Sequence, residues 1–143
     1  MVGLPENDAW RPRALADLSQ AQLDSGEAAA AYATATQALA YGRKALKDNY
    51  ELAIPLFALA RTAQALERPT EAEPLLREAL ALRSPVHPPD DPRILEVKVA
   101  MVSTLRAQQK IDESDRLRAD IDAVLTASTT PYAAELRERL AEH

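Results

Sequence analysis

The residues that could bind a metal ion or transfer a proton are few, and most of them lie in one linker. His87 stands in the segment SPVHPPDDP, shortly before Asp90 and Asp91, and the second histidine is the terminal His143. One imidazole and two carboxylates could in principle ligate a metal ion. Carboxylates in a proline-rich linker more often cap a helix or stay solvated in a turn, so we expect no metal site.

The sequence shows no recognisable catalytic motif outside this linker. The sequence has no cysteine, and neither histidine has a serine beside it in a recognisable nucleophile setting. The three glycines, Gly3, Gly26 and Gly42, stand alone and form no phosphate-binding loop. We therefore expect a protein that is not an enzyme and that has no cofactor.

Charge and hydropathy exclude several classes of partner. The 143 residues include 22 acidic and 17 basic side chains, a net charge of −5. An acidic chain without a basic run offers no footprint for nucleic acid or an anionic membrane. The longest apolar run, residues 52–60, contains Pro55 and is far shorter than the ~20 residues that span a bilayer. The N-terminus lacks the pattern of a secretory signal, so we expect a cytoplasmic location.

Composition favours helices packed through leucine and alanine. Hydrophobic residues make up 47% of the chain, whereas aromatic residues make up only 4%. The stretch TEAEPLLREALALR, residues 70–83, mixes small and large apolar side chains with residues that favour helix. A chain of this length suits one compact domain or a short array of repeats.

Such an array is indicated by three sets of residues that recur with one period. Leu18, Leu59 and Met101 stand 41 and 42 residues apart. The same two separations relate two further sets, which are Ala31, Ala72 and Ser114, and Ala38, Ala79 and Ile121. Each unit is expected to be two helices with a break between them, at DSG, ERPT and QQKID. The small residues would let the helices of a pair approach closely.

Helix starts are marked in several places. Thr70 and Glu73 have the spacing of a capping box, which would place Pro74 at the edge of the first turn. Two further N-caps are expected where Asp91 and Thr130 precede prolines. Pro55 leaves two alternatives: the third helix begins near it, or the helix begins at residue 49 and bends there.

The last segment predicts an amphipathic helix. Tyr132, Leu136 and Leu140 form an apolar stripe at i, i+4 and i+8. Stacked helix pairs expose an apolar face at each end, so this helix is expected to cap the stack. The count of expected helices is seven.

The middle unit resembles the tetratricopeptide repeat (TPR). The family pattern of W-x2-L-G-x2-Y, then A-x3-F, then P, is matched by Leu56, Leu59, Ala60 and Ala63, then Ala72 and Leu76, then Ser84 with Pro85. The period exceeds the usual ~34 residues by one turn on each helix. In this the units are similar to the long repeats of kinesin light chain. The resemblance implies an all-α, right-handed α–α superhelix of three TPR-like helix pairs plus a C-terminal capping helix.

The same resemblance implies a division of the chain. It gives an N-terminal extension at 1–11, three TPR-like hairpins at 12–48, 49–84 and 91–127, and a capping helix at 130–143. In TPR arrays the first helix of each pair lines a concave groove. Position by position, this implies a binding surface of Arg13, Ala16, Gln20, Leu23, Ile54, Phe57, Arg61, Gln64, Glu96, Val99, Ser103 and Arg106.

Chemistry suggests what such a groove would hold. Arg61 and Arg106 carry forked donors suited to a carboxylate or to peptide carbonyls, and Phe57 could anchor an apolar side chain. We expect a non-catalytic scaffold or adaptor that binds a protein or peptide, as a monomer or weak homodimer. The alternatives are a peptide-sensing regulatory domain, as in the helical arrays of larger bacterial regulators and kinases, and a self-association module.

Overall fold

The computed structural model describes residues 9–142, and this part of the chain has no strand. Residues 1–8 of the expected N-terminal extension, and His143, lie outside the described residues. The seven expected α-helices are confirmed, and a short 3-10 helix precedes the third. The bounds are α1 Trp10–Asp24, α2 Ala28–Ala45, η1 Tyr50–Leu52, α3 Ala53–Ala65, α4 Pro69–Arg83, α5 Pro92–Ala107, α6 Ile111–Ala127 and α7 Pro131–Ala141.

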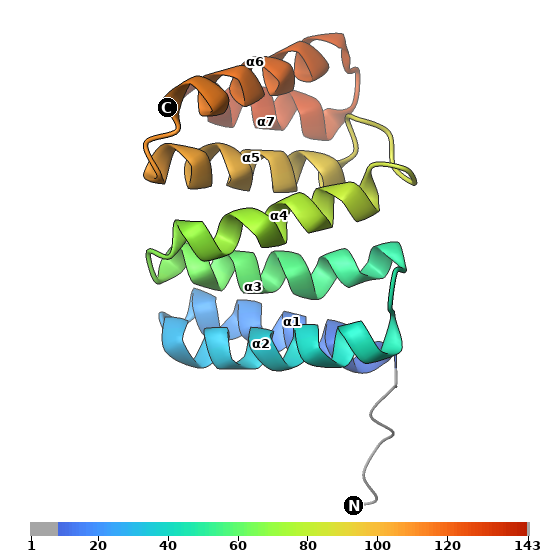
Figure 1. The fold of residues 1–143 in the computed structure, drawn as a ribbon. Coiled ribbons are helices and arrows are strands. Elements are labelled where there is room, and N and C mark those ends of the chain that lie inside the picture. Colours follow the sequence, from blue (N-terminus) through green and yellow to red (C-terminus); the bar gives the residue numbers. More distant parts are fainter. Residues whose placement is uncertain (1–8, 143) are drawn as a thin grey trace, which may run out of the picture.

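These helices form an all-α superhelical repeat, as the sequence predicts. Figure 1 shows them stacked in chain order, from α1 and α2 at one end to α6 and α7 at the other. The pairs are α1 with α2, α3 with α4, and α5 with α6, and each pair packs on the next. Each helix pair thus contacts only the pairs next to it in the stack, as expected for a repeat array.

The turn inside each pair repeats with the period that the sequence shows. Gly26, Glu67 and Gln109 occupy equivalent positions, and all three have positive φ angles, of 81°, 58° and 65°. In each turn the following amide N–H donates back to a carbonyl five residues earlier, at 2.8–3.0 Å. This is the Schellman motif, which ends a helix and reverses the chain. The second helices accordingly begin in register, at residues 28, 69 and 111.

Small residues lie at the closest approach of each helix pair. Ala31, Ala72 and Ser114 are fully buried, and so are Ala38, Ala79 and Ile121. The set of Leu18, Leu59 and Met101 is not uniform, because Leu59 and Met101 are buried while Leu18 is 49% exposed. No other described helix covers the outer side of α1, whereas α3 and α5 are covered by the preceding unit.

The expected capping box at the start of α4 is wrong. The helix begins at Pro69, Arg68 occupies the N-cap position, and no side chain caps it. The left-handed turn at Glu67 places Pro69 at the first position of the helix. There the fixed φ of proline fits the helix and its missing N–H has no cost. Pro74 is consequently an interior residue of α4 and not at its edge.

The other helix starts follow the sequence more closely. Asp91 and Thr130 are confirmed as N-caps, since their side chains accept hydrogen bonds from the amides of Arg93 (2.8 Å) and Ala133 (3.2 Å). The two alternatives for Pro55 are each borne out in part: the α-helix starts near the proline, but Asn49 caps the 3-10 helix η1 that leads directly into it. α3 begins at Ala53, so Pro55 lies in the first turn, where its amide would lack a partner in any case.

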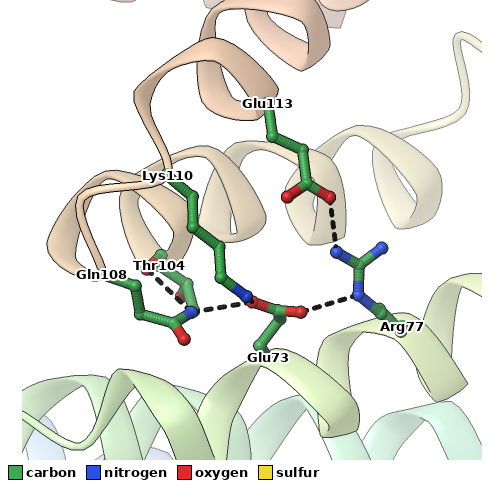
Figure 2. A network of polar contacts seen from close by, with 6 residues as sticks. All are labelled: Glu73, Arg77, Thr104, Gln108, Lys110 and Glu113. Atoms are coloured by element: carbon green, nitrogen blue, oxygen red, sulfur yellow. Dashed lines mark hydrogen bonds and ion pairs between the residues drawn. The ribbon is translucent and has the colours of Figure 1, made fainter.

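Polar contacts join the second helices of successive units. Figure 2 shows Glu73 of α4, whose Oε1 accepts hydrogen bonds from Lys110 Nζ and Gln108 Nε2, both at 2.8 Å. Its Oε2 accepts one from Arg77 Nε at 2.9 Å, and Arg77 Nη2 donates to Glu113 Oε1 of α6 at 2.7 Å. The hydrogen bond from Lys110, followed by those from Arg77 and Gln108, lowers the pKa of Glu73 from 4.5 to about 2.

The buried side chains form two clusters. The larger one extends from α2 to α5 and contains most of the buried leucines and alanines. The smaller one lies among α5, α6 and α7 and is built on Leu95, Ile121, Leu125, Ala133 and Leu136. Leu117 of α6 packs against both clusters. The core is therefore continuous in space but divided unequally along the chain.

Candidate functional site

Two adjoining cavities lie along the row of first helices. The larger, of about 770 Å³, is lined by Leu23 of α1, by residues of α3 and α5, and by Glu67 and Pro69 of the turn into α4. The smaller, of about 290 Å³, is lined by residues of α3, α5 and α7. Both cavities share Arg61, Gln64 and Ser103. We refer to the two cavities together as the groove.

The structure brings together seven of the twelve residues that the sequence nominates for the groove. Leu23, Phe57, Arg61, Gln64 and Ser103 all line the groove, which is completed in part by Glu96 and Val99. These side chains come from three first helices that are far apart in the sequence. The stacking of α1, α3 and α5 positions them, because one face of each helix points in the same direction.

The remaining nominated residues lie elsewhere. Arg13 and Ile54 line two further cavities, of about 460 and 340 Å³, and Ala16 is buried. Gln20 lines none of these cavities, and its amide donates to Asp24 Oδ1 at 2.8 Å. Arg106 also lies outside them and pairs with Asp115 of α6 at 3.1 Å.

Arg61 is the principal free cation of the groove. Its guanidinium carbon lies 5.7 Å from the centroid of the Phe57 ring, a cation–π arrangement. Within residues 9–142 no carboxylate forms an ion pair with Arg61. Phe57 is half-buried against the main core, and Arg83 approaches the same ring at 5.9 Å. Arg61 therefore presents a charged donor held over an apolar surface.

Gln64 joins the first helices of two units across the floor of the groove. Its Nε2 donates to the backbone carbonyl of Ala100 at 2.8 Å and to Thr104 Oγ1 at 2.7 Å. The amide group has two N–H donors, and both are engaged. Gln64 thus fixes α3 against α5, and only its carbonyl oxygen remains for a ligand.

Comparison with known proteins identifies the architecture. Neither a scan against models of protein families nor a search of curated proteins found a match. Among solved structures, the chain is similar to a Podosopora anserina kinesin light chain with nearly identical TPR-like repeats, with a TM-score of 0.77 at 20% identity. The match covers 90% of this chain and 61% of that one. The chain has a TPR-like repeat fold.

A second structure, a variant of the same Podosopora anserina protein, matches with a TM-score of 0.68 at 20% identity. It covers 85% of this chain and 57% of the other, so the chain spans about three fifths of the length of either match. In the TPR-like stack the groove lies on the row of first helices, and the Glu73 network lies among the second helices and their turns.

Two groove residues come from α7, which the sequence assigns only a capping role. Tyr132 and Arg139 line the smaller cavity together with Phe57 and Arg61. Burial raises the pKa of Tyr132 above its usual value. The spacing of these two residues, i and i+7, places both on one helix face and was the available signal. The last helix of the TPR-like stack therefore contributes to the groove wall.

The acidic groups near the groove differ in their partners. Glu96 accepts a hydrogen bond from Arg83 Nη1 at 2.6 Å, and the buried guanidinium of Arg83 also donates to the carbonyl of Arg93. The charge of Glu96 is therefore balanced by Arg83, although the Glu96 side chain is only partly buried. Arg61 and Arg139 form no ion pair with a carboxylate in the described part of the chain, so the smaller cavity carries an excess of positive charge.

The linker residues that could have held a metal ion are engaged in structural contacts. Both carboxylate oxygens of Asp91 accept hydrogen bonds from the side chain of Arg93, which lowers the pKa of Asp91 from 3.8 to about 2. Asp90 accepts one from Ser128 at 2.8 Å, and the His87 ring packs edge-on against Tyr50. Residues 9–142 contain no cluster of three His, Cys, Asp or Glu side chains suited to a metal ion.

Among the residues that the structure describes, no helix combines the length and the apolar character that crossing a bilayer requires.

Proposed function

We propose that the chain is a non-catalytic interaction scaffold that holds an extended segment of another protein in the groove. The TPR-like repeat fold supports an interaction role in general terms. The single observation that carries the specific proposal is the position of Arg61, unpaired and held over Phe57 where the two cavities meet. A guanidinium at such a site binds carboxylates and peptide carbonyls through paired N–H donors.

The chemistry of the groove defines the preferred segment. An acidic side chain would lie between Arg61 and Arg139, because Glu96, the carboxylate that lines the smaller cavity, is paired with Arg83. A neighbouring apolar side chain would enter the larger cavity, which offers Leu23, Ala65 and Ala107. We infer no catalytic role, because the groove residues include no nucleophile beside a general base. The scaffold acts by holding its partner.

The test uses a displayed library of random peptides selected on the intact protein. Binding of selected peptides is then measured by fluorescence anisotropy for the wild type and for Arg61→Glu. The matched control is Arg106→Glu, which makes the same charge change on a nominated residue outside the cavities. We expect Arg61→Glu to weaken binding by at least about tenfold and Arg106→Glu to have little effect.

Two results would refute the proposal. One is selection of peptides without enrichment in Asp or Glu, and the other is an equal loss of affinity in both variants. Small-angle scattering with and without a selected peptide separates a rigid scaffold from a peptide sensor, since a sensor would become measurably more compact on binding.

A further inference from the structure

A further cavity, of about 340 Å³, lies where the chain links the second unit to the third. We call it the linker cavity, and it shares only Glu96 with the groove. Its volume is at the lower end of the roughly 300–1,000 Å³ of pockets that bind small molecules. Three units supply its polar lining, which consists of Arg13, Glu51, Arg83, His87, Arg93 and Glu96.

Arg83 is the fixed cation of the linker cavity. Its side chain is only 6% exposed, and its Nη1 donates to Glu96 Oε1 at 2.6 Å and to the carbonyl of Arg93 at 2.8 Å. These two hydrogen bonds hold the guanidinium in place. Its Nε and Nη2 donate to no group in the described part of the chain, yet neither nitrogen is sealed inside the protein. A rigid pair of donors is therefore available to a carboxylate that enters the cavity.

Two further charges, of opposite sign, line the same cavity without a partner. Arg13 of α1 and Glu51 of η1 are both exposed, and within residues 9–142 neither side chain forms an ion pair. Glu96 adds a second carboxylate, which accepts a hydrogen bond from Arg83 through Oε1 alone. Unpaired groups of one sign would select a simple ion. Unpaired groups of both signs in one small cavity suit a ligand that carries both charges.

The wall of the linker cavity also contains a polar atom without a partner. His87 packs edge-on against Tyr50, with the ring centroids 5.5 Å apart. Its Nε2 is inaccessible to solvent and has no hydrogen bond to any residue that the structure describes. Such atoms are rare in folded proteins and cost free energy until a partner reaches them. An ammonium group bound in the cavity would bring N–H donors to this wall.

We propose that the linker cavity binds an α-amino acid as a zwitterion. The carboxylate binds the free donors of Arg83 together with Arg13. The ammonium binds the carboxylates of Glu51 and Glu96. An α-amino acid is the smallest common ligand in which the two charges are separated by one carbon atom. The bound amino acid joins the three units, because Arg13 belongs to the first, Glu51 to the second and Glu96 to the third.

Thermal melts of the intact protein with each of the common amino acids, at millimolar concentration, give the first test. A ligand that binds only the folded state raises the melting temperature. We expect at least one amino acid to raise it, and the best of them is then titrated by calorimetry. No increase with any amino acid would overturn the proposal.

Derivatives of the best amino acid test whether both charges are needed. Its amide lacks the carboxylate, its N-acetyl form lacks the ammonium, and inorganic phosphate is an anion without an ammonium. We expect each to bind roughly tenfold more weakly or worse, because each loses charge-assisted hydrogen bonds. Equal affinity for the N-acetyl form or for phosphate would overturn the proposal in favour of a simple anion site.

Arg13→Gln and Glu51→Gln test the residues. Both side chains are exposed, so both variants should fold, which circular dichroism checks. Each should weaken binding of the amino acid by roughly tenfold or more. The matched controls are Arg137→Gln and Glu135→Gln, which remove the same charges from exposed positions of α7 and should leave binding unchanged. Equal effects of the cavity and control variants would refute the assignment.

The rival explanation is that Arg13 and Glu51 pair with each other in solution. A double-mutant cycle on the free energy of unfolding, without amino acid, detects such a pair. We expect the two changes to be additive. Coupling between them would overturn the proposal, because both charges would then have a partner already. These results are independent of the groove, since Arg61→Glu leaves every residue of the linker cavity in place.

Discussion

Ser19 in the first unit and Ser114 in the third donate reciprocal hydrogen bonds across equivalent helix contacts. Ser19 Oγ of α1 donates to the carbonyl of Ala31 in α2 at 3.0 Å. Ser114 is the counterpart of Ala31, and its Oγ donates back to the carbonyl of Val102, the counterpart of Ser19, at 3.1 Å. The middle unit has Ala60 and Ala72 at these positions, both fully buried. The first two units therefore place two small side chains at this contact, whereas the third pairs Ser114 with the backbone carbonyl of Val102.

That contact predicts which alanines cannot be enlarged. Ala72→Leu and Ala79→Leu should each cost about 1–3 kcal/mol of unfolding free energy, because extra methylenes would force the helices of the middle pair apart. Urea denaturation followed by circular dichroism measures the change. Ala81→Leu on the same helix is the control, since Ala81 is exposed and leucine suits a helix. Equal stability of all three variants would contradict the packing described here.

The left-handed turns predict a gain in stability. Glu67→Gly and Gln109→Gly should each stabilise the protein by up to about 1 kcal/mol, because glycine adopts a positive φ without the steric cost of a side chain. Gly26→Ala should destabilise it by a similar amount. No atom lies within 4 Å of the added Cβ at Gly26, so the loss would come from the backbone alone. Thermal melts measure these changes in stability. A lower melting temperature for both glycine variants would be inconsistent with the turn geometry.

The Glu73 network predicts a dependence of stability on pH. The pKa of Glu73 falls from 4.5 to about 2 on folding, so its contribution is complete above pH 4.5 and disappears as the pH falls towards 2. Glu73→Gln should be less stable than the wild type at pH 7, and the difference should shrink over that interval. Urea midpoints measured from pH 7 to pH 2 test this. Glu135→Gln, at an exposed position, serves as the control, and a constant difference for Glu73→Gln would exclude the mechanism.

Replacing Gln64 should lower the free energy of unfolding because hydrogen bonds between α3 and α5 are lost. Gln64→Ala should destabilise the protein by about 1–3 kcal/mol, because it removes the donor to the buried Thr104 hydroxyl and one of the donors to the Ala100 carbonyl, which keeps a hydrogen bond from Ser103 Oγ. Adding Thr104→Ala should cost less than the sum of the single changes, which is the signature of a direct interaction. Gln20→Ala is the control, because its hydrogen bond to Asp24 is exposed. Additive losses at residues 64 and 104 would argue against the contact.

The fold was accessible from sequence because helical spacing and the repeat act together. Ala31, Ala72 and Ser114 could be aligned by position alone, and burial at one position then implied burial at the others. The same periodicity predicts the observed start of α4, since Ala28, Pro69 and Ile111 are in register. The spacing of Thr70 and Glu73 predicts a later start. The observed start follows the repeat, because the preceding turn fixes where the second helix can begin.

The site was less accessible, because helix faces alone do not show which charges are already paired. Arg61 and Arg106 look alike in sequence, yet only Arg106 has an acidic neighbour, Asp115, on the facing helix of its own unit. The contribution of Tyr132 and Arg139 depends on how α7 folds back over α5, which no single helix pattern specifies.

The unequal division of the core has a consequence for how the molecule opens. Because the five residues of the smaller cluster hold α6 and α7 in place, this end should loosen while the middle pair stays folded. Backbone amides of α7 should then exchange with deuterium well before those of α3 and α4, whose protection should reflect complete unfolding. An opening of this kind would detach the Tyr132 side of the smaller cavity first, so a bound segment could leave through that end without disturbing Arg61 and Phe57.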